Sequence, residues 1–143
     1  MRKTLTLLAA VLMATVLTAC GGDDEPAGDA RRIAIDMTDN AFAPDAVEVA
    51  AGEIVTFVFT NDGEAVHEAY IGTAEDQEAH ADDMAEDHGG GHDMDDGGGE
   101  VLDVDPGDTG ELTYTFAEAG EYLIGCHQPG HYEAGMRLDV EVA

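Results

Sequence analysis

The chain has 143 residues, of which 32 are acidic and only five are basic, so its formal net charge is −27 at neutral pH. Nucleic acid binding is excluded, because that function depends on basic residues that neutralise phosphates. Once an N-terminal signal is set aside, the length predicts a single domain with a modest hydrophobic core.

The N-terminus has the features of an export signal. Two basic residues precede an apolar run that is too short to span a bilayer comfortably, and the run ends at Cys20 in a pattern that resembles a bacterial lipoprotein cleavage box. We expect a signal peptide over residues 1–19 and lipid attachment at Cys20. An ordinary secretory signal with an incidental cysteine is the alternative. Residues 20–30 are polar and rich in glycine, as in a flexible tether, so the protein is predicted to be extracytoplasmic and membrane-anchored, in the periplasm or on the outer face of the cell membrane.

Most of residues 31–143 consists of short segments in which apolar and polar residues alternate, separated by turn residues. This pattern predicts an all-β domain. In the last of them, Leu138, Val140 and Val142 alternate with acidic residues, so one face of the strand meets a core. Strands are expected from residue 33 and over 46–50, 54–60, 66–71, 100–104, 111–116, 120–125 and 137–142. Two packed sheets follow from this pattern.

Residues 73–99 form an acidic insertion with two glycine triplets and few large aliphatic side chains. Its first half, as far as Asp87, is predicted to be helical, because Thr73 and Asp76 fit a capping box. Histidine and methionine residues recur along the insertion, and the first three, spaced by four, would share one helix face: His80, Met84 and His88, followed by His92 and Met94. This set is a candidate second copper site. A solvated acidic loop with incidental histidines is the alternative.

Four residues supply the ligand types of a blue copper centre. Cys126, His131 and Met136 lie in one short segment, and His67 lies on a predicted strand upstream. Two imidazoles and a thiolate with a weak axial thioether form such a site. A Greek-key β-sandwich could gather them at one end, with His67 supplied by the other sheet. Cys126 is the only cysteine outside the lipid box, which favours metal ligation over a disulfide, with intermolecular pairing as the alternative.

His127 follows the predicted thiolate ligand directly in the chain. Successive strand residues point to opposite sides, so its side chain is expected to point away from the metal, either beside the site or into solvent.

On these ligands, and on a Phe-x-Pro segment that begins at Phe42, the chain resembles the cupredoxins, the blue or type 1 copper proteins of the plastocyanin and azurin group. The spacing of the ligand loop is similar to that of rusticyanin and auracyanin. The resemblance implies one type 1 copper ion, with His67 and His131 as imidazole ligands, Cys126 as the thiolate and Met136 as the axial ligand. It departs from the family at Glu68, where many cupredoxins have asparagine.

The resemblance also implies outer-sphere transfer of one electron, with the edge of His131 as the port. The acidic charge of the chain could steer a redox partner protein with a basic docking surface, and a role in solubility is the alternative explanation of that charge. Copper enzymes of this fold carry a histidine directly before the cysteine, where this chain has Gly125, so no enzyme is expected. The alternative function is copper handling, in resistance, buffering or delivery, by means of the insertion. A sandwich used only for adhesion would require the four ligands to be a coincidence.

Overall fold

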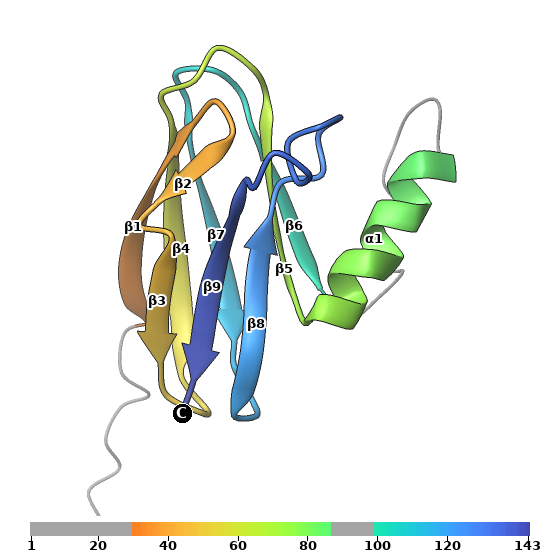
Figure 1. Cartoon of the computed structure of the whole chain (residues 1–143). Helices are drawn as coiled ribbons and strands as arrows, with labels where there is room; N and C mark the ends of the chain where they lie inside the picture. Colours follow the sequence, from red (N-terminus) through yellow and green to blue (C-terminus); the bar gives the residue numbers. More distant parts are fainter. Residues whose placement is uncertain (1–29, 87–98) are drawn as a thin grey trace, which may run out of the picture.

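The computed structural model describes residues 30–86 and 99–143, which fold into two packed β-sheets with one helix at the side (Figure 1). The elements are β1 (Arg31–Thr38), β2 (Ala41–Ala43), β3 (Ala46–Val49), β4 (Ile54–Asn61), β5 (His67–Gly72), α1 (Ala74–Glu86), β6 (Glu100–Val104), β7 (Thr109–Thr115), β8 (Gly120–Gly125) and β9 (Arg137–Val142). The predicted all-β sandwich is confirmed, and β2 is a short strand that the sequence pattern did not predict.

One sheet has four strands in the order β2-β1-β4-β7, and the other has five in the order β3-β9-β8-β5-β6. The pairs β1–β4 and β3–β9 are parallel, and the remaining pairs are antiparallel. Strands β3 and β4 follow each other closely in sequence but belong to different sheets, so the turn between them crosses the sandwich. Gly52 has a φ of 83° in that turn, a conformation that favours glycine.

The core lies between the two sheets and is built from alternate residues of the strands. Phe57, Phe59 and Phe116 are fully buried, and the ring centroids of Phe57 and Phe59 lie 6.1 Å apart. The alternation predicted for the last strand is confirmed, because Leu138 and Val140 are buried while the acidic residues between them are exposed. A slip of one residue would turn that apolar set to solvent, so burial fixes the register of β9.

Helix α1 forms the first half of the insertion and packs against β5 and β8 (Figure 1). The predicted capping box is present. The Asp76 carboxylate accepts hydrogen bonds from the backbone N–H and the hydroxyl of Thr73, at 2.8 and 2.7 Å. The helix is described as far as Glu86, and its predicted end at Asp87 lies outside the described residues.

Several predicted features lie outside the described residues. They are the signal peptide over 1–19, Cys20, the tether up to residue 29, and His88, His92 and Met94 of the insertion. Among residues 30–86 and 99–143, no helix is long and apolar enough to cross a membrane.

Candidate metal centre

The predicted ligands come from one end of the five-stranded sheet. His67 is the first residue of β5, and Cys126 directly follows the last residue of β8. These two strands are antiparallel neighbours, which places the start of β5 beside the end of β8. The expectation that His67 comes from the other sheet is therefore wrong. Pairing between neighbouring strands brings the two ligands together without a contribution from the second layer.

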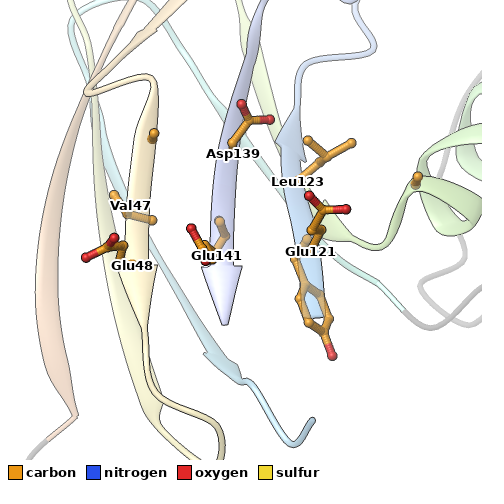
Figure 2. Close-up of a pocket in the computed structure, with 10 residues that line it drawn as sticks. Val47, Glu48, Glu121, Leu123, Asp139 and Glu141 are labelled. Atoms are coloured by element: carbon orange, nitrogen blue, oxygen red, sulfur yellow. The ribbon is translucent and has the colours of Figure 1, made fainter. Parts of the chain in front are cut away.

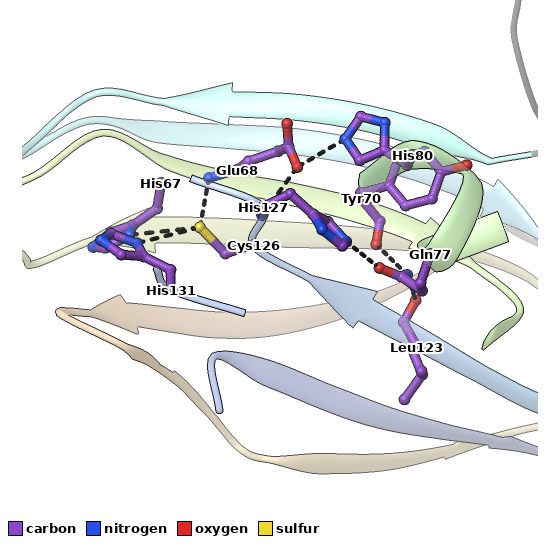
Figure 3. Close-up of polar contacts among 9 residues, drawn as sticks. All are labelled: His67, Glu68, Tyr70, Gln77, His80, Leu123, Cys126, His127 and His131. Carbon is purple, nitrogen blue, oxygen red and sulfur yellow. Dashed lines mark hydrogen bonds and ion pairs between the residues drawn. The ribbon is translucent and has the colours of Figure 1, made fainter. Parts of the chain in front are cut away.

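Both histidine rings direct the same nitrogen toward the cysteine sulfur (Figure 3). The Nδ1 atoms of His67 and His131 lie 3.9 and 3.5 Å from the Sγ atom of Cys126. One donor atom from each of the three residues lies within 4.8 Å of the other two, and no other His, Cys, Asp or Glu group in the described residues meets this criterion. His67 and Cys126 are fully buried and His131 is half-buried. Three donors thus surround one small, largely dry space.

Main-chain hydrogen bonds fix the segment that carries three of the predicted ligands. The N–H of Cys126 donates to the carbonyl of Met136 at 3.1 Å, and the N–H of Met136 donates to the carbonyl of His131 at 3.0 Å. Gly130 and Gly135 have φ values of 82° and 100°, so the turns of the segment need residues that tolerate a left-handed backbone. Met136 is fully buried. The conformation of the segment is therefore fixed largely by hydrogen bonds between its own main-chain groups.

The electrostatics suit a site that receives a cation. Burial lowers the pKa of His67, and the nearby His131 lowers it further, while Asp39 opposes both effects. The imidazole is thereby kept neutral, which is the form that binds metals. Burial raises the pKa of the Cys126 thiol, although the backbone N–H of Glu68, 3.4 Å from the sulfur, acts against it. A metal ion that binds the thiolate displaces this proton. The residues present fit a copper ion, since two imidazoles and a buried sulfur are soft and borderline donors.

Glu68 has side-chain contacts beside the site that the sequence did not predict. It is fully buried, and its Oε1 atom accepts a hydrogen bond from the backbone N–H of His127 at 3.2 Å. The same oxygen lies 3.0 Å from the Nε2 atom of His80 on α1 (Figure 3). The departure from asparagine at this position was the available signal, but the sequence did not show what the carboxylate contacts.

His127 points away from the predicted ligands, as expected, and of the two expected environments it has the one beside the site, because it is buried (Figure 3). Its Nε2 atom lies 2.8 Å from the side-chain oxygen of Gln77 on α1. The side-chain nitrogen of Gln77 donates to the carbonyls of Tyr70 and Leu123, both at 3.0 Å. Gln77 had no sequence signal beyond its place in a predicted helix.

The turn before His67 is held by the buried side chain of Asn61. Its amide nitrogen donates to the carbonyls of Ala65 and Val104 at 2.8 and 2.9 Å, and its oxygen accepts from the N–H of Gly63. The side chain closes that turn and fixes the start of β5, where the first ligand lies.

A separate hollow lies on the outer face of the five-stranded sheet (Figure 2). Carboxylates of β3, β8 and β9 line it, including Glu48, Glu121, Asp139 and Glu141, and none of the predicted ligands does. The hollow is an acidic surface feature that is distinct from the metal centre.

Comparison with known proteins identifies the family. Residues 6–136 match the sequence model of the Cupredoxin-like domain. The chain belongs to the cupredoxin-like family. It is 36% identical to the copper-resistant cuproprotein CopI of Pseudomonas aeruginosa, over 82% of this chain and 79% of that protein. It is 34% identical to the CopI protein of Rubrivivax gelatinosus, over 83% of this chain and 70% of the relative.

Among solved structures, the cupredoxin-like chain is similar to reduced auracyanin of Roseiflexus castenholzii, with a TM-score of 0.66 and 25% identity over 81% of this chain and 99% of auracyanin. The family resemblance drawn from the ligand motif is confirmed. Fold and donor set together are those of a copper-binding cupredoxin.

Proposed function

We propose that the chain is a type 1 copper protein that binds one copper ion through His67, Cys126 and His131, with Met136 as the axial ligand. The observation that carries this proposal is the convergence of two imidazole Nδ1 atoms on the buried sulfur of Cys126. When bound, copper supplies a one-electron couple that no side chain of this site offers.

The second part of the proposal is that the protein carries single electrons. The ligands lie at the ends of paired strands and on a hydrogen-bonded segment, so we expect their positions to change little between the two oxidation states. His131 is only half-buried, whereas His67 and Cys126 are fully buried, so electrons enter and leave at the His131 edge. We propose no enzymatic activity, since Gly125 stands where a wired second copper would need a histidine.

We further propose that the chain is exported by residues 1–19, lipid-anchored at Cys20 and directed to a redox partner with a basic surface. Two of the three arginines outside the signal are already paired with carboxylates of this chain, Arg31 with Glu53 and Arg32 with Glu111. The remaining acidic surface, including the hollow of Figure 2, is available to attract positive charge.

Copper handling is the second candidate function, and the names of the relatives favour it. Three relatives, from P. aeruginosa, R. gelatinosus and Vibrio cholerae, are copper-resistant cuproproteins named CopI, at 34 to 36% identity. In this role the protein would sequester or pass on copper in a resistance pathway. The same four ligands would serve as the store.

One set of measurements tests both candidates. Full-length wild type and Cys126→Ser are loaded with cupric ion, and the visible spectrum and copper content are recorded through cycles of reduction and oxidation. An intense thiolate-to-copper band that is lost in the variant supports the type 1 site, and copper retained through the cycles supports the carrier. Copper passed to a cuprous chelator of moderate affinity after reduction supports handling. Colourless binding that survives the substitution would contradict the site itself.

A further inference from the structure

We propose that helix α1 positions the metal centre, with His80 and Gln77 as positioning residues that act through Glu68 and His127. This inference deepens the proposed function and rests on it, because it concerns the surroundings of the same copper site. It gives the first half of the insertion a role beyond that of a solvated acidic arm.

Strand geometry explains how a helix on the outer face can reach the site. Neighbouring residues of an extended chain point to opposite sides. His67 and Cys126 direct their side chains toward the site, so Glu68 and His127, the next residues of each segment, project toward α1 (Figure 3). Each of the two buried ligands is therefore followed in the chain by a residue that the helix contacts.

The first link runs from His80 through Glu68 to the ligand segment. The Nε2 atom of His80 lies 3.0 Å from the Oε1 atom of Glu68, and the same oxygen accepts the N–H of His127 at 3.2 Å. The backbone N–H of Glu68 also donates to the sulfur of Cys126 at 3.4 Å. One residue thus contacts the helix, the ligand segment and the predicted thiolate.

Because Glu68 is buried, its position should depend strongly on its contact with His80. The side chain is fully buried, and its Oε2 atom has no hydrogen-bond partner among the described residues. Removing one partner of a buried polar group leaves the desolvation cost of the other uncompensated. A change at His80 therefore leads Glu68 to move or to admit water, and its other contacts move with it.

The second link runs through Gln77, whose side chain joins α1 to both strands that carry buried ligands. Its nitrogen donates to the carbonyl of Tyr70 on β5 and of Leu123 on β8, and its oxygen lies 2.8 Å from the Nε2 atom of His127. The ring of His80 stacks on that of Tyr70, with a centroid separation of 4.0 Å. The helix thus holds the two strands together at positions three residues along the chain from His67 and from Cys126.

Groups that contact metal ligands orient them and tune the redox potential of the metal. The N–H donated to the Cys126 sulfur, and the position of the Cys126–His127 peptide, are two such contacts. Both depend on where Glu68 lies. Docking of α1 is therefore expected to change the properties of the centre and not only the stability of the fold.

The test compares four single variants of the full chain. His80→Leu removes the donor to Glu68, while His80→Gln keeps a side-chain donor and serves as the conservative variant. Glu78→Ala alters an exposed position of the same helix and is the matched control. Gln77→Ala tests the second link and replaces His80→Leu if that variant does not fold.

Two readouts separate positioning from packing. In the metal-free protein, amide exchange at His127 is expected to become roughly tenfold faster in His80→Leu, since its N–H loses a well-placed acceptor. In the copper-loaded protein, the thiolate-to-copper band and the reduction potential are expected to shift in His80→Leu and to return toward wild type in His80→Gln. Glu78→Ala is expected to change neither.

Lower thermal stability with unchanged His127 exchange, band and potential would overturn the inference and leave α1 as a packing element. Failure of the wild type to form a thiolate-to-copper band would contradict the proposed function, whereas the exchange measurement on the metal-free protein would still decide whether the helix positions the ligand segment. The two failures are thus distinguishable.

Discussion

The ligand segment, residues 126–136, and helix α1 both border the five-stranded sheet, but they are held in different ways. Main-chain hydrogen bonds close the ligand segment, from Cys126 to Met136 and from Met136 to His131. Polar side chains dock α1, chiefly Gln77 and His80. The comparison shows that the shape of the segment depends on its backbone, whereas the placement of the helix depends on a few side chains.

The two regions are therefore expected to differ in local stability. A segment whose buried residues are part of the core opens only when much of the sandwich opens, whereas a helix with few buried apolar contacts can undock at lower free energy. Side-chain changes in the ligand segment should alter copper chemistry while its backbone is retained. Side-chain changes on α1 should mainly weaken the packing of the helix against β5 and β8.

The largest expected effect is that of Cys126→Ser on the copper spectrum. The substitution removes the sulfur on which both imidazoles converge, so the thiolate-to-copper band is expected to disappear entirely. Visible absorption and bound copper are measured in the full chain. Cys20→Ser removes the other cysteine and is the matched control, for which the band should be unchanged. A band lost in Cys20→Ser and kept in Cys126→Ser would place the site elsewhere.

Met136 separates packing from ligation within the ligand segment. It is fully buried, so Met136→Ala is expected to lower the free energy of unfolding of the metal-free protein by about 2–5 kcal/mol. Met136→Leu conserves volume and should cost less than about 1.5 kcal/mol. Both variants lose the thioether, so both should change the copper spectrum and the potential. Urea unfolding gives the first quantity, and a leucine variant with a wild-type spectrum would contradict axial ligation.

The grouping of His67, Cys126 and His131 could be predicted from the sequence, because a copper site requires these residue types. A cysteine, two histidines and a methionine at these spacings match few sites other than a blue copper centre. This inference does not depend on the order of the strands in the sheets. The sheet that supplies His67 could not be predicted. Strand order depends on pairing between segments that are far apart in the sequence, and the apolar alternation of one strand does not indicate which strands pair with it.

The contacts of α1 show the opposite case. The capping box of Thr73 and Asp76 is local and was predicted, because both residues lie within one turn. The partners of Gln77 and His80 lie on strands far along the chain, and neither residue type specifies them. His80 was grouped with Met84 as a metal-binding helix face, but its ring stacks on Tyr70 and faces Glu68 instead of solvent.

Gln77→Ala tests how strongly α1 depends on its side-chain contacts. The change leaves the carbonyls of Tyr70 and Leu123 without their donor in a buried setting, so the free energy of unfolding is expected to fall by about 1–3 kcal/mol. Glu78→Ala, at an exposed position of the same helix, should stay within about 0.5 kcal/mol of wild type. Urea unfolding of the metal-free proteins compares them. Equal effects of the two substitutions would mean that Gln77 does not dock the helix.

The smallest expected effect is that of Thr73→Ala, which removes the hydroxyl of the capping box. Loss of such a cap costs about 0.5–2 kcal/mol, and Thr73→Ser, which keeps the hydroxyl, should restore most of it. If α1 undocks as a separate unit, the cost appears as faster amide exchange along Ala74–Glu86, while the amides of His131 and Met136 keep their wild-type rates. Faster exchange in both regions would show instead that helix and ligand segment open together, and the contrast between them would then lie in their contacts but not in their stability.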